Sequence, residues 1–222
     1  VSNSSSVLLA SQKREAEFTY GKSRFLEEAR YLAKFNSHPN IVNVFEYFEA
    51  NGTAYFVMEY LGGKTFDKAI IEDNWRGQPI SCELCVTIAV AICSALQSMH
   101  AAGILHRDIS PNNIMLCDNG DIKLLDFGAA RFPSGVEAQL RVVKPGFTPP
   151  EQYNEVDKQG PFTDIYALGA TLYYALSGTV PEESTDRKKA DSLIPLEELN
   201  RYVPHHISVT IMRAMAIEPQ YR

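Results

Sequence analysis

Positions 106–128 contain the residues best suited to chemistry in this 222-residue chain. Asp108 stands at the head of a polar loop that ends at Asn113, and a second aspartate, Asp126, follows two short apolar runs. Amide and carboxylate oxygens suit Mg²⁺, which proteins commonly bind together with the oxygens of a polyphosphate. Asp108 would then remain to act as a base. The pattern indicates a site that handles phosphate groups.

A β-hairpin must bring Asn113 and Asp126 together. A short apolar run lies on each side of Asn119-Gly120, and Asn-Gly is typical of a two-residue type I′ turn because both residues accept positive φ angles. If these two residues form the turn, paired residues have numbers that sum to 239, which sets Asn113 opposite Asp126. We therefore predict an amide and a carboxylate side by side at strand ends.

The same residues resemble a known family. His106-Arg107-Asp108 with Asn113 resembles the catalytic-loop pattern H-R-D-x-x-x-x-N of protein kinases, and Asp126-Phe127-Gly128 resembles their D-F-G. The resemblance implies that Asp108 orients and deprotonates the hydroxyl of a protein substrate. It also implies that Asn113 and Asp126 hold the Mg²⁺ ions that bridge the phosphates of ATP.

An amphipathic helix is predicted from Ser23, its N-cap, to Phe35, after a loose Ser-rich segment over residues 1–22. Glu28 lies at the edge of the apolar face of this helix, where a carboxylate needs a cationic partner. In the kinase resemblance this is helix C, and Glu28 is the glutamate that pairs with a strand lysine and so supports ATP binding. The alternative is an ordinary solvated helix charge.

A second Asn-Gly hairpin is predicted over residues 41–60, with Asn51-Gly52 as its turn. Its second strand resembles the kinase strand that leads into the hinge between lobes. The resemblance implies that the backbone of Glu59 and Leu61 binds adenine, with Met58 as the gatekeeper and Met115 below the ring. The alternative is that these methionines are plain core residues.

The second half of the chain is predicted to be mainly helical. Ser81 caps a long apolar helix that begins at Cys82 and ends near Ala101. Cys82 and Cys85 form a lone C-x-x-C, which we interpret as ordinary helix residues because the chain has no second cysteine pair and no thioredoxin-like strand.

Further kinase-like signals follow this helix. Pro149-Pro150-Glu151 resembles the kinase A-P-E, and the resemblance implies an ion pair between Glu151 and Arg222. It also implies that Asp164 ties its helix to the catalytic loop. A long loop, 129–148, precedes the A-P-E-like segment; its lone hydroxyl between Arg131 and Lys144 is Ser134, and Glu137 could supply a permanent charge instead.

The chain departs from the kinase pattern at three points. It shows no Gly-rich loop and no V-A-x-K strand before Glu28, so we expect that the sequence is cropped and is itself weakly active or inactive. Ser110 stands where serine/threonine kinases usually have lysine, and counting back from Glu151 places Lys144 where they have a threonine. A cation and a hydroxyl would thus be exchanged, with both side chains catalytic. The alternative for Lys144 is a solvated loop charge or a contact in the substrate groove.

Composition limits the class of protein. Hydrophobic residues make up 45% of the chain and charged residues 22%, as in soluble globular proteins, and the formal net charge of −6 argues against a broad nucleic-acid surface. We see no apolar run of the roughly 18–20 residues that a membrane helix needs. Four cysteines in a chain of this length favour a reducing cytoplasm.

The predicted fold is α+β: a two-lobed, protein-kinase-like single domain. Residues 1–60 form an incomplete N-lobe of helix C and a β-hairpin, and residues 61–222 form a mainly helical C-lobe. The predicted function is a bacterial-type serine/threonine protein kinase that uses ATP and Mg²⁺ on a protein substrate. Two alternatives are a pseudokinase-like scaffold, which the intact Asp108, Asn113 and Asp126 disfavour, and a small-molecule phosphotransferase, which Pro149-Pro150-Glu151 disfavours.

Overall fold

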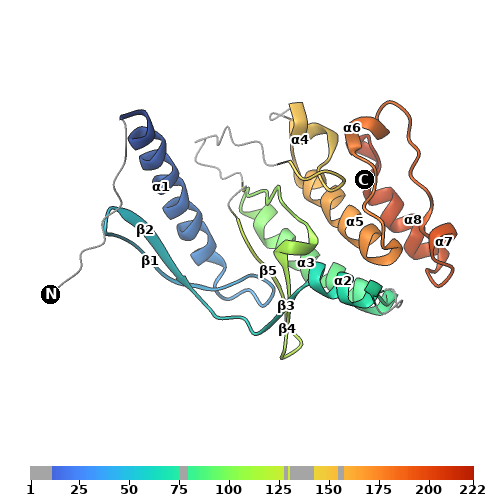
Figure 1. Cartoon of the computed structure of the whole chain (residues 1–222), viewed down its shortest axis with the longest axis horizontal. Coiled ribbons are helices and arrows are strands. Elements are labelled where there is room, and N and C mark those ends of the chain that lie inside the picture. The colour runs from blue at the N-terminus through green and yellow to red at the C-terminus, as the bar shows by residue number, and fades with distance from the viewer. Residues whose placement is uncertain (1–11, 76–79, 128–129, 131–142, 155–157) are drawn as a thin grey trace.

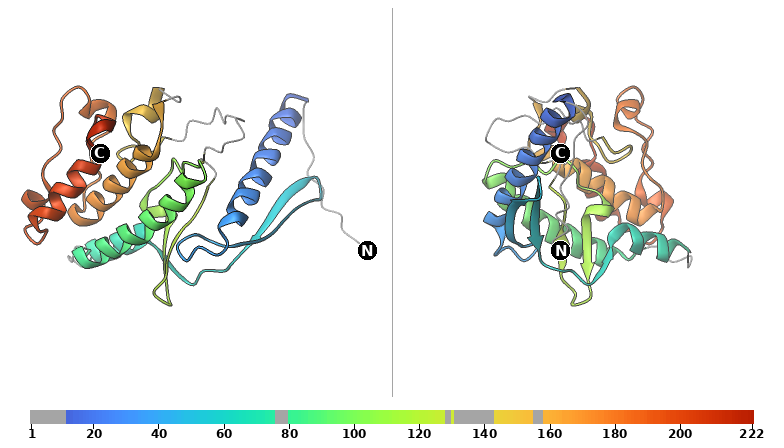
Figure 2. Two further views of the ribbon diagram at one scale, coloured as in Figure 1. Left: turned by 180° about the vertical axis from the view of Figure 1, so that it is seen from behind. Right: turned by 60° about the vertical axis from the view of Figure 1, so that its left-hand side comes forward.

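The computed structural model describes residues 12–75, 80–127, 130, 143–154 and 158–222. Helix α1 and the β1–β2 hairpin form one end of the molecule, α5 to α8 form the other, and α3 with the second sheet lies between them (Figures 1 and 2). The elements in chain order are α1 (Gln12–Leu32), a 3-10 helix (Ala33–Phe35), β1 (Val44–Ala50), β2 (Thr53–Met58), β3 (Gly63–Thr65), α2 (Phe66–Trp75), α3 (Cys82–Ala101), a 3-10 helix (Pro111–Asn113), β4 (Ile114–Cys117), β5 (Ile122–Leu124), α4 (Pro150–Asn154), α5 (Pro161–Ser177), α6 (Ser184–Arg187), α7 (Leu196–Leu199), α8 (His205–Ala214) and a 3-10 helix (Pro219–Tyr221).

Helix α1 begins well before its predicted start. It starts at Gln12, so the prediction of a loop was wrong for residues 12–22, of which the first six are good helix formers. Ser23 is not an N-cap: its hydroxyl donates to the carbonyl of Thr19, one turn earlier, at 3.0 Å. The predicted end was right, because the 3-10 helix continues to Phe35.

The β1–β2 hairpin forms as predicted. Asn51 and Gly52 have φ angles of 52° and 74°, as a type I′ turn requires, and Ala50 pairs with Thr53 across them. One face of this two-stranded sheet packs on α1, where the rings of Phe25 and Phe56 lie 4.6 Å apart. The sheet is otherwise sparsely covered, since a further seven large apolar residues from β1, β2 and the segment after them are exposed: Phe45, Tyr47, Phe48, Tyr55, Val57, Met58 and Tyr60.

The hairpin that follows the catalytic loop has a different register from the predicted one. Ile114 pairs with Leu124, so paired numbers sum to 238 and Asn113 lies opposite Leu125, not Asp126. The loop has three residues, and only its Gly120 has a positive φ, +89°. This is a type I turn closed by a glycine bulge, in which the N–H of Gly120 donates to the carbonyl of Cys117 at 3.0 Å.

Helix α3 forms the centre of the core. Ser81 caps it as predicted, because its hydroxyl accepts the N–H of Leu84 at 3.2 Å. The buried face consists of Cys85, Ile88, Ile92, Ala95, Leu96 and Met99. Helix α3 packs against α5, which in turn packs against α8, so the C-terminal half is the helical lobe that we predicted.

Two predictions about α3 have clear outcomes. Burial raises the pKa of the Cys85 thiol to about 12 and also raises that of Cys82, which agrees with ordinary helix residues rather than a reactive pair. The expectation that no apolar run is long enough to span a membrane was wrong. Within the described residues, α3 alone is long and apolar enough to do so. Length and composition are weak evidence here, because buried core helices meet the same criteria.

Candidate active site

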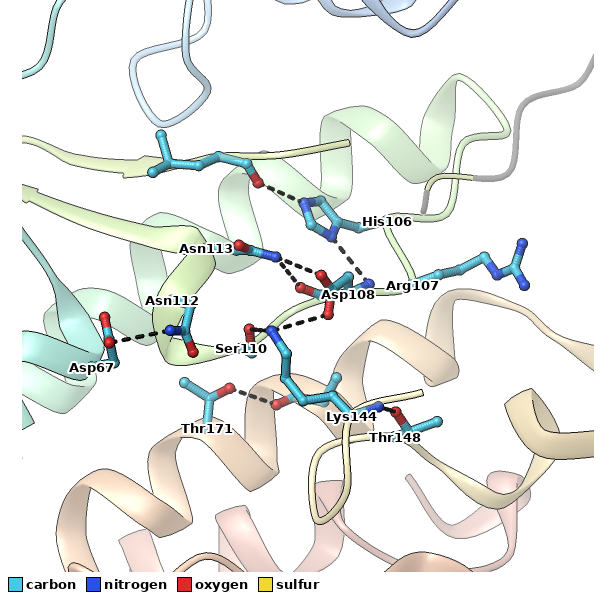
Figure 3. A network of polar contacts seen from close by, with 12 residues as sticks. Asp67, His106, Arg107, Asp108, Ser110, Asn112, Asn113, Lys144, Thr148 and Thr171 are labelled. Atoms are coloured by element: carbon cyan, nitrogen blue, oxygen red, sulfur yellow. Dashed lines mark hydrogen bonds and ion pairs between the residues drawn. The ribbon is translucent and has the colours of Figure 1, made fainter. Parts of the chain in front are cut away.

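Asp108 and Asn113 meet at the two ends of the catalytic loop. The side-chain amide of Asn113 donates to both the carbonyl and the carboxylate Oδ2 of Asp108, each at 2.8 Å. These bonds turn the amide nitrogen toward Asp108 and leave the amide oxygen on the other side (Figure 3). The loop is therefore closed by its own polar residues, and the carboxylate of Asp108 has one defined orientation.

His106 connects this loop to the hairpin strand β5. Its Nδ1 accepts the N–H of Asp108 at 3.3 Å and its Nε2 lies 3.1 Å from the carbonyl of Leu125, so the network assigns the proton to Nε2 (Figure 3). Burial lowers the pKa of His106 despite nearby carboxylates, which agrees with a neutral ring. Its ring also lies 4.9 Å from that of Phe127.

Asp164 anchors the loop to α5. Its two carboxylate oxygens accept the backbone N–H groups of His106 and Arg107 at 3.0 and 2.8 Å, and His100 contributes a further contact of 2.7 Å. Asp164 is fully buried, and Arg107 has a positive φ of 66°. A buried carboxylate thus holds the backbone in a conformation that a non-glycine residue rarely adopts. The tie between Asp164 and the catalytic loop is present as the resemblance implied.

Glu28 and Asp126 lie close to each other. The carboxylate of Glu28 accepts the N–H of Phe127 at 3.2 Å, and burial together with the charge of Asp126 raises the pKa of Glu28 to about 7. Asp126 has a positive φ of 53° and is exposed. The charge of the nearby Arg24 lowers the pKa of Glu28 but is outweighed. The strand lysine that pairs with this glutamate in the kinase resemblance has no counterpart among the described residues. Gly128, the last residue of the D-F-G match, lies outside the described residues, as do Ser134 and Glu137.

The residues predicted to bind adenine line the connection between the two sheets. Met58 is the last residue of β2 and is exposed, while Glu59, Leu61 and Met115 are half-buried. The N–H of Glu59 donates to the carbonyl of Asn43 at 3.0 Å, so the carbonyl of Glu59 is its backbone group that could bind a ligand.

Lys123 on β5 is a residue that our sequence reasoning missed. Its ammonium lies 2.7 Å from the Glu59 carboxylate, and both side chains are largely buried. Burial opposes ionisation of Glu59, but the hydrogen bonds from Lys123 and Asn43 outweigh it and lower its pKa. A lone lysine between Ile122 and Leu124 was the available signal, since strand alternation turns it to the opposite face.

Lys144 reaches the catalytic loop from a separate segment. Its ammonium donates to the hydroxyl of Ser110 at 2.7 Å and lies 3.4 Å from Oδ1 of Asp108 (Figure 3). Ser110 is fully buried. The structure therefore brings together the cation and the hydroxyl that the sequence comparison treated as exchanged, beside the predicted base.

The pair between Glu151 and Arg222 forms as the resemblance implied. The contacts are bidentate, at 2.6 and 3.2 Å, and the two side chains are 4% and 0% exposed. Arg222 also donates to the carbonyls of Ala216, Ile217 and Phe162, which accounts for its remaining three donors in a buried setting.

The donor set fits Mg²⁺ held jointly with phosphates. Asn113 offers an amide oxygen turned away from Asp108, and Asp126 offers an exposed carboxylate at the end of the same hairpin. Within the described residues no group of three or more His, Cys, Asp or Glu side chains could hold a metal alone. Mg²⁺ bound through one or two protein oxygens and several phosphate oxygens matches this arrangement.

These features define a class: a two-lobed α+β domain with a base and hard oxygen ligands on a loop between its lobes. Residues 6–215 match the family model described as "Protein kinase domain". The chain belongs to the protein kinase family, whose members transfer phosphate from ATP with the help of Mg²⁺.

Similar proteins indicate which type of protein kinase this chain is. The chain is 36% identical over 209 residues to "Serine/threonine-protein kinase PknK" of Mycobacterium tuberculosis, covering 90% of this chain and 18% of that protein. It is 34% identical to "Tyrosine-protein kinase MasK" of Myxococcus xanthus, covering 89% and 33%. The solved structure "PpkA-294 apo form" has a TM-score of 0.85 at 34% identity, covering 100% of this chain and 77% of that one. The chain is a kinase domain of bacterial serine/threonine type and spans a third or less of these two curated relatives.

Proposed function

We propose that this domain transfers the γ-phosphate of ATP to a serine or threonine hydroxyl of a protein substrate. One observation supports the proposal above the others: Asp108 is fixed by Asn113 on one side and faced by Lys144 on the other. A base with a set orientation beside a cation is the arrangement that phosphoryl transfer to a hydroxyl needs. A scaffold without chemistry has no need to orient these groups.

In the proposed reaction, the carboxylate of Asp108 accepts the hydrogen bond of the substrate hydroxyl and then its proton. The hydroxyl oxygen forms a bond to the γ-phosphorus while the bond to the bridging oxygen breaks, and ADP leaves. Asn113 and Asp126 would hold Mg²⁺, which neutralises charge on the phosphates when bound. The protein's own contribution is mainly positioning, and the ties from Asp164 and His106 supply it.

Further assignments belong to the same proposal. The carbonyl of Glu59 and the backbone of Leu61 would bind adenine between Met58 and Met115, and the boundary between the lobes would fall at residues 60 and 61. The four cysteines are free thiols, which supports a cytoplasmic location, and the net charge of −6 supports a protein rather than a nucleic acid as partner.

The test uses the full-length protein, radiolabelled ATP and Mg²⁺ with a mixture of bacterial proteins as acceptors. Phosphoserine and phosphothreonine should appear in the products, and Asp108→Asn should lower the rate by about 10²–10⁴-fold while nucleotide binding persists. Phosphotyrosine alone would overturn the hydroxyl assignment. Transfer to small metabolites without protein labelling would favour a small-molecule phosphotransferase, and unchanged labelling by Asp108→Asn would remove Asp108 from the mechanism.

A further inference from the structure

We propose that Lys144 is a catalytic residue: it supplies, from the last part of the long loop 129–148, the cation that stabilises the transferring phosphate. The inference rests on the proposed function, because it assigns a role within phosphoryl transfer. The inference goes beyond that function because Lys144 lies outside the catalytic loop. It also assigns to Ser110 the role of positioning the Lys144 ammonium.

The first evidence is the position of the Lys144 ammonium. Among the described residues, the ammonium contacts the hydroxyl of Ser110 at 2.7 Å and Oδ1 of Asp108 at 3.4 Å. The other oxygen of Asp108 already accepts the amide of Asn113, so Asp108 does not depend on Lys144 for its orientation. The acceptor oxygen of the substrate must approach Asp108 to lose its proton, and the phosphorus that it attacks must then lie near the ammonium as well.

The backbone of Lys144 is held firmly. Its N–H donates to the hydroxyl of Thr148 at 2.8 Å, and its carbonyl accepts the N–H groups of Phe147 and Thr148 at 3.0 and 3.1 Å. The carbonyl of Thr148 in turn accepts the hydroxyl of Ser184 at 2.7 Å. The turn 144–148 is thus tied to the helical lobe, and the ammonium occupies its position before any ligand arrives.

The turn cannot easily move away. Gly146 has a positive φ of 82°, and a Cβ there would lie 2.5 Å from Cγ1 of Val180 and 2.7 Å from the carbonyl of Pro181. The close packing of this glycine fixes the distance between the turn and the lobe. A preorganised cation costs no reorganisation when charge develops in the transition state, which is the condition for a large electrostatic contribution.

Exposure distinguishes this lysine from a buried structural ion. Its side chain is 32% exposed, against 15% for Asp108 and a fully buried Ser110. Within the described residues the ammonium donates one hydrogen bond, to Ser110, and its contact with Asp108 is an ion pair. Lys144 is therefore held by Ser110 while about a third of its side chain stays accessible to a phosphate.

The test compares steady-state kinetics of the full-length protein and its variants. Lys144→Thr should lower kcat by about 10²-fold or more and leave the KM for ATP little changed, since the contact is made in the transition state. The double variant Lys144→Thr with Ser110→Lys should recover part of the loss, because it returns a cation to the other side of Asp108. Lys189→Thr is the matched control: Lys189 is exposed, paired with Asp186, and should leave kcat unchanged.

Each outcome has a defined meaning. A kcat of Lys144→Thr within about threefold of the parent overturns the proposal. A large kcat loss in Lys144→Thr without any recovery in the double variant, together with a lowered midpoint of thermal unfolding, also overturns it, since Lys144 would then be structural. If the parent protein itself transfers no phosphate, the proposed function fails and this inference fails with it, a result that the parent assay alone reveals.

Discussion

The carboxylates of Glu28 and Glu59 differ in the charged groups that lie next to them. Glu59 has Lys123 at 2.7 Å, and its pKa is lowered in spite of burial. The carboxylate of Glu28 accepts the backbone N–H of Phe127, and burial together with the charge of Asp126 raises its pKa to about 7 although Arg24 is near. Glu28 is thus a carboxylate whose ionised form the present surroundings disfavour.

The raised pKa of Glu28 predicts a pH dependence of stability. Between its ordinary value of 4.5 and about 7, the unfolded chain has lost the proton while the folded chain retains it. The free energy of unfolding should therefore fall as pH rises through this window and level off above it. In Glu28→Gln, which cannot ionise, this part of the fall should be absent.

Urea unfolding of the 222-residue chain and of Glu28→Gln from pH 4 to 8 measures this difference. The difference between the two should be constant near pH 4 and should grow up to about pH 7 in favour of the variant. Parallel curves across the whole range would contradict the prediction.

The pair between Arg222 and Glu151 gives a second residue-scale prediction. Both side chains are almost fully buried, so Arg222→Ala leaves a carboxylate buried without its partner and should lower the free energy of unfolding by about 3–5 kcal/mol. Urea unfolding measures it. The control is Lys189→Ala, which removes an exposed pair with Asp186 and should have no measurable effect. Equal effects of the two substitutions would show that the buried pair contributes no more than a surface one.

At the scale of elements, two Asn-Gly sequences form two different turns. At Asn51-Gly52 both residues have positive φ and the loop has two residues. At Asn119-Gly120 only the glycine has positive φ, and the side chain of Asn119 instead accepts the N–H of Asp121 at 3.1 Å. This local side-chain bond accompanies the three-residue loop, which shifts every pair in the hairpin by one.

Alanine substitutions at two glycines in open space should have opposite effects, because only one of the two glycines has a positive φ. A Cβ on Gly120 meets nothing within 4 Å, but its φ of +89° disfavours any other residue, so Gly120→Ala should destabilise the chain by about 1–2 kcal/mol. Gly21 lies inside α1, also in open space, and Gly21→Ala should stabilise it by about 0.5–1 kcal/mol. Chemical denaturation checks both, and effects of the same sign would contradict the assignment of the turn.

At the scale of the molecule, the small lobe has a sparsely covered sheet. The β1–β2 sheet has two strands and leaves several aromatic residues exposed, Phe45 at 68% and Tyr60 at 95% among them. No Gly-rich loop and no V-A-x-K lysine precede Glu28 in the sequence, so nothing in it encodes the usual cradle for the phosphates. The 222-residue polypeptide by itself should therefore bind nucleotide weakly and transfer phosphate at near-background rates.

An assay of ATP turnover checks this expectation. The 222-residue polypeptide is compared with a version to which a Gly-rich loop and a strand lysine have been added ahead of residue 1. Comparable turnover in the two would show that the hairpin, Asp108, Asn113 and Asp126 suffice without those parts. The thermal unfolding midpoint of both proteins serves as the control for folding.

The sequence by itself determined the local chemistry and the family. Asp108, Asn113 and Asp126, the capped helix α3, and the pairing of Glu151 with Arg222 could all be predicted from short motifs and from the family order, and the structure places each contact within these elements as described. The motifs and the helix cap can be predicted because residue type and spacing along one segment decide them. The pair between Glu151 and Arg222, which are 71 residues apart, was predicted only from the kinase resemblance.

Only the tertiary structure decided contacts whose partners are distant in the sequence or whose geometry hinges on a single residue. The register of the β4–β5 hairpin follows from a three-residue loop in which Asn119 bonds to the N–H of Asp121, and α1 starts at a residue without a clear cap signal. The pair between Glu59 and Lys123 joins positions 64 residues apart, which no local pattern reports. The place of Lys144 beside Asp108, although suspected from counting, required the packed turn 144–148 to fix its distance, because a flexible lysine is positioned by its surroundings and not by its sequence.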